Sequence, residues 1–161
     1  MTVFDFDEQH MRGWKGEAFL DRFFRARGHI VQKATRGQQR QGIDRVLIFD
    51  EKLATVEYKT DFIAHKTGCV FIETVSVDSD HKAGWAFTSM ADLLVYFIPG
   101  IRCLYVIPFK YLRDLLEEWK TTYPTRSAQN DGYATHGVLV PIAAFALSAS
   151  QVFNVTPSDD Q

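Results

Sequence analysis

Two apolar stretches separated by a short polar turn dominate the first half of the chain. Residues 42–49 and 52–59 are rich in aliphatic and aromatic side chains, and Asp50 and Glu51 stand between them. Such residues favour strands, and a link this short joins antiparallel neighbours. The pattern therefore predicts a β-hairpin over these residues.

Helical periodicity occurs before this hairpin and again in the second half. Apolar residues recur at three- and four-residue spacing over residues 12–27, before Gly28, and over residues 109–120, after Pro108. This spacing places them on one helix face, and glycine and proline suit the two helix ends. Strand-like segments and one short helical or extended segment (143–150) complete the pattern: 29–34, 69–77, 93–98, 102–107 and 137–142. Together they predict an α/β fold with a mixed central sheet of five to six strands flanked by helices.

Three polar segments are predicted to lack regular structure. Residues 35–42 contain two glycines and no apolar side chain, and residues 121–132 contain a proline, an asparagine and a glycine. Both compositions are typical of loops. The polar tail from Thr156 is expected to fray.

Length and composition fit one ordinary globular domain over residues 1–161. The chain is 46% hydrophobic and 24% charged, with a formal net charge of −2. Nucleic-acid-binding proteins are often basic, so DNA binding would depend on local clusters of positive charge.

The sequence favours a cytoplasmic protein. Cys69 and Cys103 are distant and lack C-x-x-C spacing, which predicts free thiols in a reducing compartment rather than a zinc site. No apolar run reaches the roughly 20 residues that cross a bilayer, and the N-terminal residues do not resemble a signal peptide. We therefore expect no membrane association.

Charged residues at the hairpin provide the candidate chemistry. Asp44 lies near the start of the first strand, and Glu57 and Lys59 lie at the end of the second. Alternation along a strand places Glu57 and Lys59 on the same side. Carboxylate oxygens suit Mg²⁺ or Mn²⁺, and an ammonium can orient water or neutralise phosphate charge. Each residue alone is compatible with an exposed strand charge, but their combination favours a site.

These residues resemble a known signature. Asp44, followed after twelve residues by Glu57-Tyr58-Lys59, is similar to the D…(D/E)-x-K signature of the PD-(D/E)XK nuclease superfamily, with Ile43 where the proline would stand. The resemblance covers about the first half of the chain and implies a restriction endonuclease-like fold. An acidic residue on the first helix of that family is matched by Glu17.

The resemblance implies a metal-dependent endonuclease that hydrolyses DNA phosphodiester bonds. Asp44 and Glu57 would hold Mg²⁺ or Mn²⁺, Glu17 would assist directly or through water, and Lys59 would position the attacking water or stabilise the developing charge. Junction resolvases, repair endonucleases, phage-encoded nucleases and restriction subunits are all of this kind. A homodimer is compatible with those that cut two strands.

Further residues are candidates for DNA contact. Arginine presents a planar fork to phosphate oxygens, and cations cluster around residues 35–42. The candidates are Lys33, Arg36, Arg40, Arg45 and Lys66. Glu73, in the middle of a strand-like segment, is a second-tier site residue because a buried carboxylate needs a partner.

Two other interpretations stay open. One is a non-catalytic DNA-binding or assembly module on the same fold. The other is an α/β domain whose charges are merely solvated. A nuclease site requires Glu17, Asp44, Glu57 and Lys59 to gather around one cavity, whereas solvated charges would be scattered.

Overall fold

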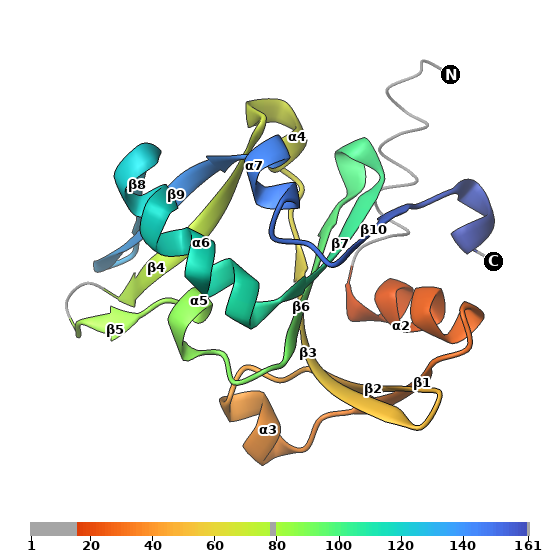
Figure 1. The fold of residues 1–161 in the computed structure, drawn as a ribbon. Helices are drawn as coiled ribbons and strands as arrows, with labels where there is room; N and C mark the ends of the chain where they lie inside the picture. Colours follow the sequence, from red (N-terminus) through yellow and green to blue (C-terminus); the bar gives the residue numbers. More distant parts are fainter. Residues whose placement is uncertain (1–15, 78–79, 161) are drawn as a thin grey trace.

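Two β-sheets form the framework of the protein, a computed structural model that describes residues 16–77 and 80–160 (Figure 1). The six strands of the central sheet, in spatial order, are β1 (Ile30–Lys33), β2 (Arg45–Phe49), β3 (Lys52–Thr60), β6 (Leu93–Ile98), β7 (Cys103–Pro108) and β10 (Gln151–Asn154). The four strands of the second sheet are β5 (Lys82–Ala83), β4 (Cys69–Val77), β9 (Tyr133–Pro141) and β8 (Thr125–Asn130).

The central sheet is mixed, as predicted. Strands β1, β2 and β3 form an antiparallel meander, β3 pairs with β6 in parallel, and β7 and β10 continue antiparallel. The second sheet is a correction, because the sequence predicted one sheet only. Composition identified β4 as a strand over the correct residues, but a strand's composition does not say which neighbour it pairs with, and β4 pairs with β9.

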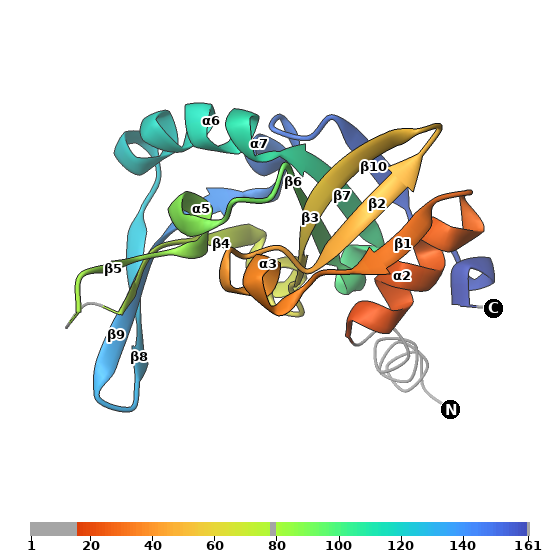
Figure 2. The same cartoon turned by 90° about the horizontal axis from the view of Figure 1, so that it is seen from below.

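Helices cover both faces of the central sheet. Helix α2 (Glu17–Ala26) packs on one face, where Phe19 stacks on Phe97 at 5.2 Å between ring centroids. The second sheet and three helices lie on the opposite side (Figures 1 and 2): α5 (Trp85–Thr88), α6 (Phe109–Thr122) and α7 (Ile142–Ala146). None of the helices in residues 16–77 and 80–160 is long and apolar enough to cross a membrane.

The predicted hairpin is present, and its turn explains its register. Asp50 and Glu51 both have positive φ angles, 51° and 62°, which is the backbone of a type I′ turn. The twist of this turn matches that of the flanking strands, and it pairs Phe49 with Lys52. The register of the hairpin carries Arg45 opposite Val56, with Glu57 and Lys59 farther along β3.

The three segments predicted as irregular contain regular structure. Residues 35–42 include α3 (Arg36–Arg40), whose first turn is capped by reciprocal bonds between Thr35 and Gln38. This capping box satisfies the free backbone N–H groups and offsets the unfavourable glycine. Residues 121–132 include β8 (Thr125–Asn130), an edge strand whose six residues are all exposed, so that burial does not alternate along it.

The tail is also ordered where it is described. Strand β10 joins the edge of the central sheet, and a 3₁₀ turn follows at Pro157–Asp160. The Asp159 carboxylate lies 3.0 Å from the Arg27 guanidinium, just beyond the end of α2. Helix α2 begins at Glu17, and the predicted helical residues 12–15 lie outside the described part of the chain. Two short elements remain: α4 (Ala64–Thr67) and a 3₁₀ turn at Pro99–Ile101.

Candidate active site

Glu57 and Lys59 form an ion pair on β3. The Nζ atom of Lys59 lies 3.0 Å from Oε1 of Glu57, which confirms that both side chains project from the same side of the strand. Their neighbours on β6 are Leu94 and Tyr96, both part of the core beneath α6 and the second sheet. Glu57 is only 6% exposed, so this pair is held at the edge of an apolar core.

One oxygen of Glu57 has no partner. Its Oε2 atom is buried and accepts no hydrogen bond from any described residue. A buried polar atom without a partner costs about 1–3 kcal/mol, so such atoms are uncommon in native proteins. An acceptor that is kept in this state is suited to a ligand that binds carboxylate oxygen.

Asp44 lies beside this pair, immediately before β2. Its Oδ2 atom accepts a hydrogen bond from the backbone N–H of Tyr58 at 2.7 Å. Burial raises the pKa of Asp44 above its ordinary value of 3.8, and the charge of Glu57 adds to this, although Tyr58, Lys59 and Arg45 oppose it. Asp44, Glu57 and Lys59 are therefore one electrostatic group.

Close backbone packing fixes the segment that leads into Asp44. Gly42 has a φ of +79°, and a Cβ atom there would lie 2.9 Å from Oγ of Ser89. The N–H of Met90 also donates to the carbonyl of Gln41 at 2.8 Å. Glycine is needed at this point both for its conformation and for the space.

Arg45 is directed into the protein. Its guanidinium is buried and contacts Asp21 at 2.9 Å and Glu17 at 2.8 Å, both on α2. A further nitrogen donates to the backbone carbonyl of Asp44 at 2.8 Å, and the Tyr58 hydroxyl donates to Asp21 at 3.2 Å. The structure thus gives Arg45 an internal role in place of the expected phosphate contact.

Glu17 is linked to the site through Arg45. Its carboxylate is half exposed and pairs with Arg45, while the charges that act on Asp44 come from Glu57, Lys59 and Arg45. The structure therefore brings together three of the four predicted catalytic residues. Within residues 16–77 and 80–160, no three carboxylate, histidine or cysteine side chains are grouped as a metal site.

The other basic candidates occupy two separate surfaces. Lys33, Arg36 and Arg40 are exposed at the end of β1 and on α3, close in sequence to Asp44. Lys66 is exposed on α4. Figure 1 shows α3 and α4 near opposite ends of the molecule along β3.

Glu73 is half-buried on β4. It follows Phe71 by two residues, so both side chains lie on the same face of the strand. A Cβ atom at Gly84 would lie 2.3 Å from the Glu73 carbonyl oxygen, so α5 begins against this strand. No hydrogen bond or ion pair links the Glu73 carboxylate to another described residue, and its role at the site stays a prediction.

Trp85 packs against the core at one edge of its ring and is half-buried beneath the candidate lysine. The Lys59 Nζ atom lies 5.4 Å from the centroid of its ring, within the range of a cation–π contact. This pair could not be predicted from the sequence, because 25 residues separate the two positions and only the packing of α5 joins them.

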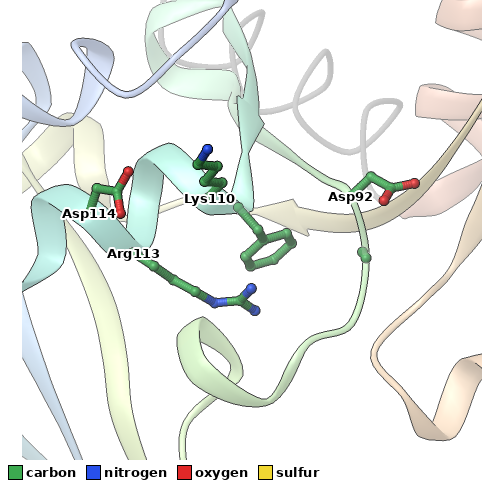
Figure 3. Close-up of a pocket in the computed structure, with 6 residues that line it drawn as sticks. Asp92, Lys110, Arg113 and Asp114 are labelled. Atoms are coloured by element: carbon green, nitrogen blue, oxygen red, sulfur yellow. The ribbon is translucent and has the colours of Figure 1, made fainter.

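A pocket near α6 is lined by Asp92 and Arg113, whose side chains make structural hydrogen bonds (Figure 3). Arg113 donates to the carbonyls of Ala86 at 3.0 Å and of Ser89. Asp92 accepts hydrogen bonds from the backbone and the hydroxyl of Thr55, both at 2.9 Å. These two groups hold the segment between α5 and β6, and we assign the pocket no further role.

Comparison with known proteins gives no relative: no family model, curated protein or solved structure matches this chain.

Proposed function

We propose that this protein is a magnesium-dependent endonuclease that hydrolyses DNA phosphodiester bonds. The observation that carries the proposal is the state of Glu57, a buried carboxylate with one oxygen on Lys59 and the other without a partner. A divalent cation would satisfy that oxygen. An ammonium fixed beside it would face any phosphate that the cation binds.

Asp44 and Glu57 fit a magnesium ion. Mg²⁺ keeps several waters and is often held by one or two carboxylates together with substrate phosphates. Two carboxylates are therefore enough, and a third protein ligand is not required. The raised pKa of Asp44 supports the same proposal, since a nearby cation would relieve the cost of keeping this carboxylate ionised.

Lys59 would act on the reacting groups. A bound magnesium ion polarises a phosphate oxygen and makes a coordinated water more acidic. The Lys59 ammonium makes one ion pair, with Glu57, lies near the Trp85 ring and lines an open cavity, so it keeps donor capacity for a ligand. This donor capacity would position water or stabilise negative charge on the phosphate.

The order of elements agrees with the resemblance. Helix α2 carries Glu17, Asp44 precedes β2, and β3 carries Glu57 and Lys59. We propose that Glu17 supports Asp44 through Arg45 rather than as a direct metal ligand. Lys33, Arg36 and Arg40 are proposed phosphate contacts. A homodimer and a cytoplasmic role in repair, recombination or restriction also remain proposals.

The alternative function is a DNA-binding module without catalysis. It is favoured by the Glu57–Lys59 ion pair, because each charge already neutralises the other. On this alternative the unpartnered Oε2 atom of Glu57 lowers the free energy of unfolding, and no bound ligand offsets this cost. The two functions differ in one respect: only the nuclease needs a metal ion at Glu57.

A cleavage assay with matched variants separates the two. Supercoiled plasmid, linear duplex, single strand and a four-way junction would be incubated with Mg²⁺ or Mn²⁺. We expect metal-dependent cleavage by the native protein and a loss of about 10²–10³-fold in Lys59→Ala, since that is the usual effect of removing one charge-stabilising donor. DNA affinity should be retained.

Lys110→Ala is the matched control, because Lys110 is an exposed lysine on α6. Equal cleavage by the native and Lys59→Ala proteins would refute the role of Lys59. DNA binding without cleavage of any substrate would favour the non-catalytic module.

A further inference from the structure

A cavity of about 330 Å³ lies directly beside Lys59. Its aromatic lining comes from four separate segments and consists of Phe62, Phe71, Trp85 and Tyr96. Phe62, Phe71 and Trp85 are only half-buried, so part of each ring surface is accessible and does not pack in the core. Half-buried aromatic rings around a hollow form a surface on which a flat apolar group can stack.

Hydrogen bonds and aromatic packing hold the walls of the cavity in place before any ligand binds. The Asp61 carboxylate accepts hydrogen bonds from the backbone N–H groups of Ile63 and Ala64, both at 2.8 Å, and from the Tyr96 hydroxyl at 2.7 Å. Trp85 packs edge-to-face on the buried ring of Phe109. Asp61 is therefore a structural carboxylate, and the rings need little reordering when a ligand binds.

Lys59 belongs to both the cavity and the candidate active site. It lines the cavity, pairs with Glu57, and lies above Trp85. A phosphate next to the Lys59 ammonium would therefore place the rest of its nucleotide at the mouth of the cavity. Positive charge at the rim and aromatic walls inside match the two parts of a nucleotide.

We propose that this cavity accepts one unpaired nucleobase of the DNA substrate, stacked against Trp85 and Phe62. This inference rests on the proposed nuclease function and names its substrate class: DNA with unpaired nucleotides next to the scissile phosphate. A base inside a duplex is stacked and paired and does not reach a pocket of this kind unless it leaves the helix. Stacking on aromatic rings tolerates any base, so little sequence preference follows.

The test uses binding without metal, in EDTA, so that it does not depend on cleavage. An oligonucleotide with 2-aminopurine in an unpaired segment would be titrated with the native protein, Phe62→Ala, Trp85→Ala and the control Tyr111→Ala. Tyr111 is an exposed aromatic residue on α6. We expect quenching by the native and control proteins and a loss of affinity of about tenfold in each cavity variant, the usual effect of one stacked base.

The outcomes distinguish the two proposals. Equal affinity for unpaired and fully paired DNA, or quenching that survives both cavity substitutions, would overturn the cavity inference. Quenching that depends on Phe62 and Trp85, without metal-dependent cleavage by the native protein, would support the cavity and refute the nuclease. Phe62→Ala guards against misfolding, because Phe62 lies outside both buried core clusters, whereas Trp85 packs against one of them.

Discussion

The backbone N–H of Tyr58 donates a hydrogen bond to the Asp44 carboxylate at 2.7 Å, and the Tyr58 hydroxyl donates to Asp21 on α2 at 3.2 Å. One residue of β3 thus contacts both the candidate metal ligand and the helix behind the sheet. Arg45 makes a parallel link from Asp21 to the Asp44 carbonyl. Two separate links, one through Tyr58 and one through Arg45, therefore connect Asp44 to the buried carboxylate of Asp21.

Replacing Asp44 by Asn should stabilise the metal-free protein at neutral pH. The pKa of Asp44 is raised by burial, so the ionised carboxylate lowers the free energy of unfolding above that pKa. The amide of Asn can still accept from Tyr58 without carrying charge. Thermal unfolding should show a higher Tm for Asp44→Asn at pH 7.

The same variant should bind manganese far more weakly in calorimetric titration. The difference in Tm should shrink as the pH falls through the raised pKa of Asp44 and disappear below 3.8, where the carboxyl of the native protein is protonated in both the folded and the unfolded state. A lower Tm at pH 7 would contradict this prediction and show that the contacts of the ionised carboxylate with Tyr58, Lys59 and Arg45 outweigh the cost of its burial.

Glu17→Gln distinguishes a supporting role from direct metal binding. Glu17 is half exposed and contacts Arg45, so its loss should cost no more than about 1 kcal/mol of stability. We expect less than about a tenfold loss of cleavage and unchanged metal affinity, because the amide oxygen can still accept from Arg45. A loss of metal affinity as large as that of Glu57→Gln would make Glu17 a ligand.

Arg36→Ala and Arg40→Ala test the phosphate contacts proposed for α3. Each removes one exposed cation, so affinity should fall for all DNA sequences alike. The slope of log K against log salt should decrease by about 0.7–0.9 for each arginine removed. Lys120→Ala on α6 is the control. An equal decrease of the salt slope in that variant would show that the effect is not specific to α3 and would refute the proposed contacts.

Asp159→Asn should weaken the attachment of the tail to α2. Burial opposes ionisation, but the Thr156 amide and the Arg27 guanidinium hold the pKa of Asp159 below its ordinary value of 3.8. The stabilisation is therefore complete above pH 3.8 and is lost as the pH falls through the lowered pKa. We expect a cost of about 0.5–1 kcal/mol at pH 7 in urea unfolding, and a difference that disappears in acid.

The sequence predicted those elements that carry many apolar side chains into the core. The bounds of β4 and β6 were predicted correctly from their content of β-branched, aromatic and aliphatic residues. Strand β8 was not recognised, since all six of its residues are exposed and five of them are polar. Helix α3 was not recognised either, because it buries no residue and its stability comes from the Thr35 cap.

The sequence predicted only those contacts of the candidate site that join neighbouring positions of one strand. Strand alternation was enough to place Glu57 beside Lys59. The attachment of Glu17 to Arg45 was not predictable, because it depends on how α2 lies across the sheet. The same is true of Trp85, whose contact with Lys59 requires a close approach of α5 to β4 that Gly84 permits.

The chain leaves the central sheet and returns to it twice. Strands β4 and β5 come between β3 and β6 in sequence, and β8 and β9 come between β7 and β10. Neither sheet can therefore be assembled from one continuous piece of the polypeptide. The interlaced sheets should unfold in a single transition, and a protease that cuts at the β8–β9 turn should release no half that stays folded by itself.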